Sequence, residues 1–260
     1  MHTVHTMKSL FGETIYIAPV GFEIDRIVMP AITSKADVVY LIVHENKSED
    51  KALKYVDEVQ SQLEKKKIKV VIKPVDRLRV FSIIRTVKEI IDENKNAKFI
   101  VNVASGSKIH AIALMMACMV HQDKEKILPI YPKPKKYQIE EFKSIKEQQT
   151  YGVDEILRLP TYNLPIPSKD LLGALKIIKE YQKKSKNGIT KKILAEDAVA
   201  ENLINKSDAA DVGRAEMASL DKKIIKPLQN RWHLIEERKI GKNRHITLSK
   251  EGEYASEFLF

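Results

Sequence analysis

The sequence predicts an α/β protein in which a Rossmann-like, doubly wound, mostly parallel sheet is followed by a small winged helix-turn-helix domain. Three observations predict this. Apolar, β-branched runs alternate with amphipathic helical patterns over residues 13–131. A stretch with three prolines then interrupts the chain at residues 159–167. Beyond it, residues 168–260 follow the order helix, helix, helix, hairpin, helix, which is typical of a winged helix.

Five runs in the first part are rich in Val, Ile and aromatic residues and carry no polar face. These expected strands are residues 13–20, 37–44, 68–75, 98–103 and 127–131. Between them, apolar residues recur at helical spacing in the ranges 24–34, 47–66, 80–94 and 108–120. Strands that are apolar on both faces belong in a parallel sheet covered by helices. We also expect residues 137–142 and 155–159 to add antiparallel edge strands.

Pro160, Pro165 and Pro167 place the domain boundary. Proline cannot sit inside a helix or a central strand, so this stretch is expected to be extended and stiff. The sequence therefore predicts a first domain of residues 1–158, a linker of residues 159–167 and a second domain of residues 168–260.

Composition narrows the class of protein. The chain has 260 residues, 43% of them hydrophobic, and 45 Lys and Arg against 35 Asp and Glu, for a net charge of +10. That composition excludes a disordered chain and favours a polyanionic partner. The single cysteine, Cys118, excludes a disulfide scaffold and a cysteine-rich zinc module. No run of apolar residues is long enough to span a membrane, and no secretory leader is recognisable, so we expect a cytoplasmic protein without membrane contact.

Two turns are candidate binding elements, because doubly wound sheets bind ligands at the carboxyl ends of their strands. The first turn, after residues 13–20, contains Gly21 and Phe22. The second, after residues 98–103, contains Ser105, Gly106, Ser107 and Lys108 at the start of a helix. Backbone N–H groups and the helix dipole at such a turn favour phosphate. The alternative is that Ser105 and Ser107 only cap the helix.

Several classes of enzyme lack support. The chain has no G-x-G-x-x-G in its first turn and no Walker A motif, which argues against a dinucleotide oxidoreductase and a P-loop NTPase. None of the seven histidines has metal-ligand spacing, so we expect no metal and no resident cofactor, and we assign no catalytic residue.

The second turn, Asn102-x-x-Ser105-Gly106-Ser107-Lys108, resembles that of the CRISPR-associated Rossmann-fold (CARF) family, as does the strand and turn from Ile15 to Phe22. Ser107 stands where many members have a second glycine. The resemblance implies a homodimer with one ligand pocket across its twofold axis and a cyclic oligoadenylate as ligand. It further implies that Ser105, Gly106, Ser107 and Lys108 hold phosphate or ribose, and that Gly21 and Phe22 approach ribose or base. Arg77 and Arg79 either add charge there or are solvated surface residues.

The second domain has the sequence signals of a winged helix. Ser168 is the expected N-cap of a helix over residues 170–184, and Thr190 of a second helix that extends through Val199. A third helix is expected over residues 212–232, ended or kinked near Lys226 by Pro227. A hairpin around residues 241–243 and a last helix over residues 250–260 complete the pattern.

Cations mark the surfaces that such a domain turns to DNA. On the third helix these are Lys222, Lys223 and Lys226, with Ser219 beside them; on the hairpin they are Arg238, Lys242 and Arg244. Lysines contact mostly phosphate, so binding to double-stranded DNA should depend strongly on salt. The alternative is that these lysines are only the solvated face of a helix.

Together these patterns predict a ligand-responsive transcription regulator of CRISPR antiviral defence that senses a cyclic oligoadenylate or similar nucleotide and binds DNA. Two alternatives stay open: a ring nuclease that degrades the ligand, with Ser107 and Lys108 assisting, and a regulator outside CRISPR defence that senses another metabolite. An effector nuclease is less supported, because residues 168–260 show no acidic cluster of metal-nuclease type.

Overall fold

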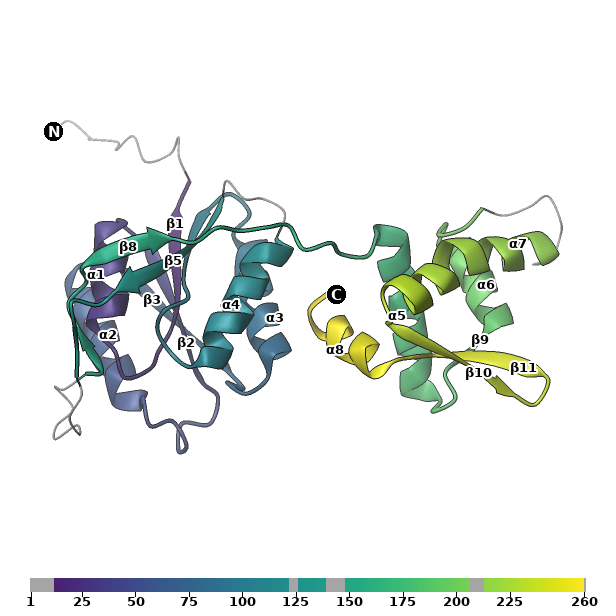
Figure 1. Ribbon diagram of the computed structural model, residues 1–260, viewed down its shortest axis with the longest axis horizontal. Helices are drawn as coiled ribbons and strands as arrows, with labels where there is room; N and C mark the ends of the chain where they lie inside the picture. Colours follow the sequence, from purple (N-terminus) through teal and green to yellow (C-terminus); the bar gives the residue numbers. More distant parts are fainter. Residues whose placement is uncertain (1–11, 122–125, 139–147, 206–212, 260) are drawn as a thin grey trace, which may run out of the picture. The chain divides into compact units, whose positions relative to one another are not determined.

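A computed structural model describes residues 12–121, 126–138, 148–205 and 213–259. The chain divides into two compact units, residues 1–164 and 165–260 (Figure 1). The division falls inside the stretch that the sequence assigns to the linker. Within the described ranges, no helix has the length and apolar character needed to cross a membrane.

The first unit is built on a six-stranded sheet with the order β3-β2-β1-β4-β5-β8. Its strands are β1 (Thr14–Pro19), β2 (Val38–His44), β3 (Lys69–Val75), β4 (Lys98–Asn102), β5 (Ile127–Lys133) and β8 (Glu155–Arg158). The first five are parallel, and β8 pairs antiparallel with β5 at the edge. This confirms the predicted doubly wound, mostly parallel sheet.

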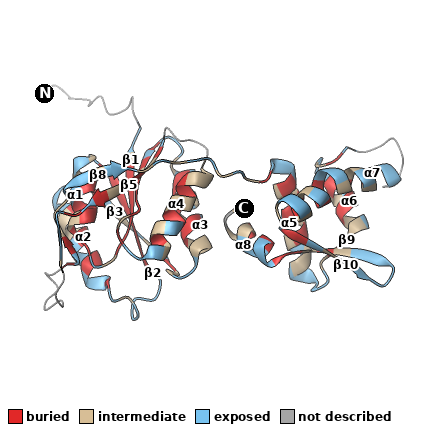
Figure 2. Cartoon of the chain, viewed as in Figure 1, coloured by how far each residue is buried: buried red, intermediate tan, exposed pale blue. Residues whose placement is uncertain are grey.

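Helices cover both faces of the sheet. On one face α1 (Asp25–Thr33) packs with α2 (Leu53–Lys65), and on the other α3 (Val80–Glu93) packs with α4 (Lys108–Val120) (Figure 1). The buried residues lie on the strands and on the helix faces that meet them (Figure 2). Cys118 is among them, 3% exposed on α4.

Helix α2 begins later than the expected range 47–66. The side chain of Asn46 accepts the N–H of Ser48 at 3.1 Å, and that of Asp50 accepts the N–H of Ala52 at 2.9 Å. Such side-chain turns compete with helix formation, so the helix starts only at Leu53.

The segment after β5 differs from the predicted edge strand over residues 137–142. Lys136–Tyr137 (β6) pair with Thr150–Tyr151 (β7) in a separate two-stranded sheet rather than with the main sheet. Residues 139–142 lie outside the described residues.

The start of the linker is fastened to the first unit by backbone hydrogen bonds. The N–H of Leu159 donates to the carbonyl of Pro129, and the N–H of Leu164 donates to that of Met119, each at 3.0 Å. Met119 belongs to the last turn of α4, whose first residue is Lys108. One helix therefore connects the second candidate turn with the linker.

The second unit is the predicted winged helix. It consists of α5 (Lys169–Lys184), β9 (Ile189–Thr190), α6 (Lys191–Ala200), α7 (Arg214–Leu220) with its continuation to Arg231, β10 (Ile235–Ile240), β11 (Asn243–Leu248) and α8 (Lys250–Leu259). The strands form a three-stranded sheet in the order β10-β11-β9. The short strand β9 was not predicted, because two residues between helices leave no periodic pattern.

Pro227 does not end the third helix. The helix continues through two π-helical stretches, Asp221–Ile225 and Pro227–Arg231. The N–H of Lys226 reaches the carbonyl of Asp221, and that of Trp232 reaches the carbonyl of Pro227, both five residues back. This wider turn accommodates a residue that has no N–H and whose ring crowds an ordinary α-helix. Of the two outcomes expected near Lys226, an end or a kink, the end is therefore contradicted, and the helix passes Pro227 with a local change to π-helical hydrogen bonding. We call residues 214–231 the recognition helix.

Candidate functional site

The two candidate turns meet at the point where the strand order reverses. Strands β1 and β4 are neighbours, and the chain proceeds from them toward opposite edges of the sheet. A Cβ atom on Gly21 would lie 3.0 Å from the Cα atom and the nitrogen of Gly106. The backbones of the two turns are therefore in contact. A topological switch point of this kind is the usual ligand position in open α/β sheets.

Two features require glycine at position 106: its backbone conformation and the lack of space for a side chain. Its φ is +77°, a conformation that residues with a side chain rarely adopt. A Cβ atom there would lie 2.9 Å from Cβ of Pro19, the last residue of β1. Gly106, Ser107 and Lys108 are exposed, so backbone and a cation face solvent at the start of α4.

Ser107 caps α4. Its Oγ accepts the N–H of His110 at 3.3 Å, while its own N–H donates to Nδ1 of His110 at 3.2 Å. This is a capping box with histidine in the usual place of Glu or Gln. The capping role that the sequence left open for Ser107 is thus present, and its exposure leaves room for a second role.

His110 is a neutral, buried ring in the first turn of α4. Burial, and then the positive charge of Arg77, lower its pKa to about 4. Because Nδ1 accepts a backbone N–H, the neutral ring carries its proton on Nε2. Among the described residues, neither this Nε2 nor Oγ of Ser105 has a hydrogen-bond partner, although both atoms are buried.

The other predicted ligand residues have different surroundings. Ser105 is 1% exposed, so its hydroxyl lies beneath the turn and not on it. Phe22 is 38% exposed and is braced edge-on by Tyr55 of α2, with ring centroids 5.6 Å apart. The positive charge of Arg77 lowers the pKa of His110, so Arg77 lies near this edge of the sheet. Arg79 is exposed at the start of α3.

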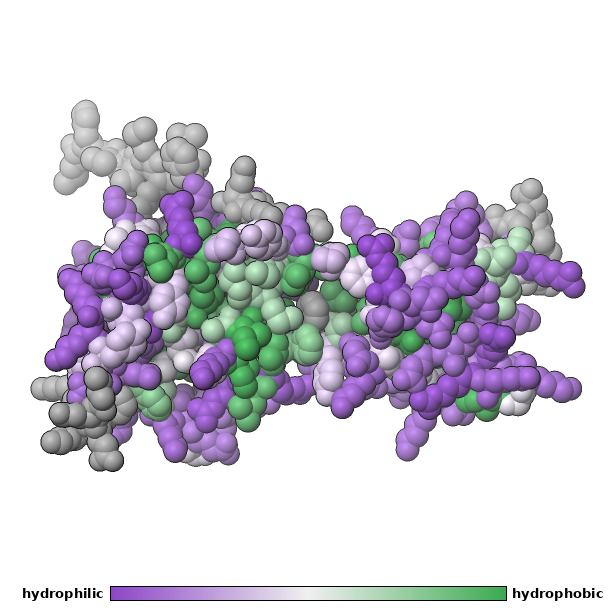
Figure 3. All heavy atoms as spheres, viewed as in Figure 1, coloured by the Kyte–Doolittle hydropathy of each residue, from purple (hydrophilic) through white to green (hydrophobic). Residues whose placement is uncertain are grey.

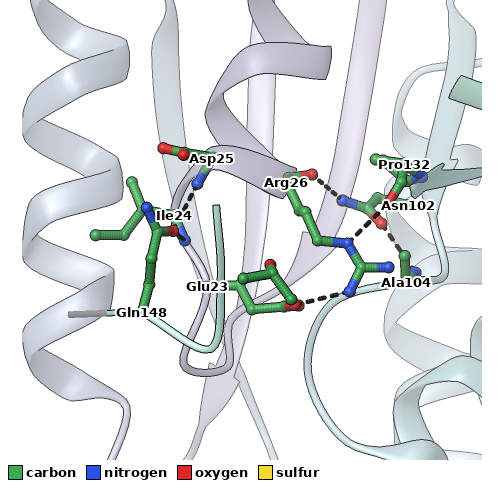
Figure 4. A network of polar contacts seen from close by, with 9 residues as sticks. Glu23, Ile24, Asp25, Arg26, Asn102, Ala104, Pro132 and Gln148 are labelled. Atoms are coloured by element: carbon green, nitrogen blue, oxygen red, sulfur yellow. Dashed lines mark hydrogen bonds and ion pairs between the residues drawn. The ribbon is translucent and has the colours of Figure 1, made fainter. Parts of the chain in front are cut away.

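A buried polar network that sequence reasoning missed holds the first turn in place (Figure 4). The Glu23 carboxylate accepts from Nη1 of Arg26 at 2.7 Å and from the hydroxyl of Thr150 at 2.8 Å. Arg26 also donates from Nε to the carbonyl of Pro132 at 2.7 Å, and its guanidinium lies 4.9 Å from the Tyr131 ring centroid.

The same network reaches the second turn through Asn102. Its Nδ2 donates to the carbonyl of Arg26 at 2.8 Å, and its Oδ1 accepts the N–H of Ala104 at 2.9 Å (Figure 4). Gln148 accepts the N–H groups of Ile24 and Asp25 at 2.6 and 3.0 Å. The two turns are therefore fixed relative to each other by charged and amide groups beneath them. An isolated Gln-x-Thr segment gives no sequence signal for such long-range contacts.

The predicted DNA-contacting cations lie on the recognition helix and the hairpin, as expected. Lys222, Lys223 and Lys226 are exposed, whereas Ser219 is half-buried. On the hairpin Arg238, Lys242 and Arg244 are exposed. The two arginines pair with glutamates of the same hairpin, Arg238 with Glu236 at 2.6 Å and Arg244 with Glu237 at 3.3 Å. The two arginine side chains are 72% and 63% exposed, so both cations stay accessible.

The winged helix also contains a cleft that the sequence did not reveal. It has a volume of about 710 Å³. Its lining comes from the start of α6 with the residue before it, from the recognition helix and from the hairpin: Thr190, Lys191, Lys192 and Ile193, then Met217 and Asp221, then Lys242, Asn243 and Arg244. Thr190 is the predicted cap of α6, and its Oγ1 accepts the N–H of Ile193 at 3.3 Å. Lys191 and Lys192, which directly follow this cap, are the sequence signal from which a basic surface here could have been predicted.

Across the parts of the chain that the structure describes, no three histidine, cysteine or acidic side chains gather in a way that could hold a metal ion. The polar groups described above are hydrogen-bond donors, exposed lysines and buried amides. These suit the binding of an anion.

Comparison with known proteins adds family matches for both units. A family model described as HFX_2341_N:-like, N-terminal, matches residues 14–137. A second, described as the DUF6293 C-terminal winged helix domain, matches residues 170–259. The uncharacterized protein MJ1513 of Methanocaldococcus jannaschii is 28% identical over 185 residues, which cover 63% of this chain and 55% of that protein. The chain thus spans about half the length of this curated relative.

Three solved structures resemble this chain with low sequence identity and low TM-scores. Can2 from Sulfobacillus thermosulfidooxidans in complex with cyclic tetra-adenylate is 23% identical, with a TM-score of 0.37 over 45% of this chain and 31% of that one. Enterococcus italicus Csm6 bound to cyclic hexa-2′-fluoro-hexa-dAMP is 14% identical, with a TM-score of 0.42 over 74% and 50%. Protein VC1899 from Vibrio cholerae is 11% identical, with a TM-score of 0.41 over 90% and 75%.

Proposed function

We propose that this chain is a ligand-responsive, DNA-binding transcription regulator that senses a cyclic oligoadenylate through its first unit. The contact between Gly21 and Gly106 carries the proposal. It joins the two turns at the switch point of the sheet, where backbone and the cation of Lys108 are exposed. The CARF-like motif at residues 102–108 supports a cyclic oligoadenylate over other anions.

The proposal includes a homodimer, because a ring with repeated phosphates matches two copies of one turn related by a twofold axis. The apolar surface of α4 supports this. Ile112 is 56% exposed, and the half-buried Met115, Met116 and Met119 continue from it at helical spacing. Figure 3 shows apolar side chains gathered over this part of the first unit. Exposed apolar surface of this kind is typical of an interface.

The winged helix supports the DNA-binding half of the proposal. In this fold the recognition helix enters the major groove and the hairpin touches the backbone or minor groove. The exposed cations of residues 222–226 and 238–244 lie on these two elements. Regulation requires that ligand favour one of two arrangements of the dimer. Helix α4 supplies a path, since it starts at the ligand turn and ends where the linker is hydrogen-bonded.

The decisive experiment measures ligand and DNA together on the full chain. Thermal unfolding against a panel of cyclic oligoadenylates should show stabilisation by about 2.7 kcal/mol when a bound ring is present at 100 times its Kd. Lys108→Gln should weaken that effect, whereas Lys222→Gln should leave it unchanged. A duplex selected from random-sequence DNA should then bind with different affinity in the presence of the ring.

Two results would overturn the proposal: no stabilisation by any ring, or ligand binding without a change in DNA affinity. Mass spectrometry of the incubated ligand separates a sensor from a ring nuclease, since linear products appear only if the ring is cut. Stabilisation by an unrelated nucleotide instead would point to a regulator outside CRISPR defence.

A further inference from the structure

The basic cleft of the winged helix contains cations in two different states. Its lining brings together the first turn of α6, one face of the recognition helix and the tip of the hairpin. These are the elements that flank DNA in this fold. Four lining residues are cationic, namely Lys191, Lys192, Lys242 and Arg244, and Asp221 is the one lining residue with a negative charge.

The positive charge of Lys191 is already paired with a carboxylate. Its Nζ lies 2.5 Å from a carboxylate oxygen of Asp221, and the two side chains are only 14% and 35% exposed. The pair joins the first residue of α6 to the recognition helix. A partly buried contact this short is screened less by water and salt than an exposed one.

The other cations of the cleft are held loosely. Lys192 lies 3.8 Å from Glu196, with its side chain 75% exposed. Arg244 is 63% exposed and 3.3 Å from Glu237, and Lys242 is exposed next to the hairpin turn. The side chains of Lys192 and Arg244 are mostly exposed, so their charges can exchange a carboxylate for a phosphate at small cost.

We propose that this cleft seats the DNA backbone and that Asp221 withholds Lys191 from it. Lys192, Lys242 and Arg244 contact phosphate, whereas Lys191 stays paired with Asp221 and contacts none. Asp221 therefore limits the number of phosphate contacts and, with it, the affinity for DNA of any sequence. This inference rests on the proposed DNA-binding function.

The test is the salt dependence of binding to a nonspecific duplex, measured for full-length variants. Each phosphate contact adds about 0.9 to the slope of log affinity against log salt and roughly eightfold to affinity at 0.1 M salt. K192Q should lower the slope by about 0.9, because one contact is lost. K191Q should leave the slope nearly unchanged, because Lys191 contacts no phosphate in the wild-type chain. D221N should raise the slope by about 0.9, because Lys191 is released to the phosphates.

The double variant D221N/K191Q is decisive, because it removes the carboxylate without releasing a cation. Its slope should return to that of the wild-type chain. K183Q, on the exposed face of α5 outside the cleft, is the matched control for loss of a surface lysine. Thermal unfolding of each variant separates a change in contacts from a loss of fold.

Three results would overturn the inference: an unchanged or reduced slope in folded D221N, a raised slope that persists in D221N/K191Q, or equal losses in K191Q and K192Q. Failure of the DNA-binding half of the proposed function has a different signature. In that case the wild-type chain and every variant fail to bind DNA, and the inference falls with it.

Discussion

Gly21 and Gly106, 85 positions apart in the sequence, are in direct backbone contact: a Cβ atom on Gly21 would lie 3.0 Å from both the Cα atom and the nitrogen of Gly106. The pair closes the carboxyl edge of the sheet between β1 and β4. Any side chain at either position must separate the two turns, so the ligand site and the local fold depend on the same two residues.

Gly106→Ala is expected to lower both the stability of the fold and the affinity for ligand. The left-handed backbone costs a side-chain-bearing residue about 1–2 kcal/mol, and the added methyl group meets Pro19 at 2.9 Å. We expect a loss of about 2 kcal/mol in unfolding free energy and at least a tenfold loss of ligand affinity, measured by urea unfolding and titration calorimetry. Gly241→Ala is the control, since its φ of +61° carries the same strain with nothing within 4 Å. A similar loss of ligand affinity in both variants would contradict the role of the contact.

The stability of the first unit should depend on pH through His110. Its pKa in the folded chain is about 4, against 6.5 for an ordinary histidine, so the unfolded chain binds more protons between these values. The stabilisation from the neutral ring is therefore complete above pH 6.5 and is lost as pH falls toward 4, by up to about 3 kcal/mol.

Urea unfolding of the wild-type chain and His110→Gln between pH 4 and 7.5 measures this contribution as the difference between the two curves. His110→Gln should remove most of the extra slope in that window. Parallel curves for the two proteins would show that another group titrates.

The Glu23–Arg26 pair should behave as a buried ion pair. Glu23→Gln leaves the guanidinium of Arg26 buried without its carboxylate, so we expect a loss of about 3–5 kcal/mol in unfolding free energy. The double variant Glu23→Gln/Arg26→Met should recover part of that loss, because neither charge is then buried alone. A loss below about 1 kcal/mol in the single variant would mean that the pair is not buried in solution.

Ile112→Glu should separate the proposed dimer without unfolding the protomer. The side chain is exposed on α4, so a carboxylate there is tolerated in the monomer but would be buried in an interface. Sedimentation velocity should show a shift from dimer to monomer. Met29→Glu, at a site 40% exposed on α1, is the control and should remain dimeric. Identical oligomeric states for both variants would place the interface elsewhere.

The layered architecture could be predicted because each of its elements is encoded locally. The apolar runs at residues 14–19 and 38–44 and the helical spacing of residues 80–93 each form the element that their pattern indicates. The winged helix was predictable for the same reason, since its caps and hairpin turn are short-range signals.

Long-range polar contacts could not be predicted. Glu23 meets Thr150 across 127 positions, and Lys191 meets Asp221 between two helices. Neither contact follows a period of 2 or 3.6 residues, so no sequence pattern encodes it. The π-helical passage of Pro227 was missed because the rule for proline assumes α-helical hydrogen bonds.

The buried position of Cys118 also has an experimental use. Burial raises the pKa of its thiol to about 12, so the reactive thiolate is scarce at neutral pH while α4 is packed. The carbonyl of the neighbouring residue, Met119, accepts the N–H of Leu164 within the linker. Since the chain has one cysteine, the rate of its alkylation reports directly on how often this end of the helix opens.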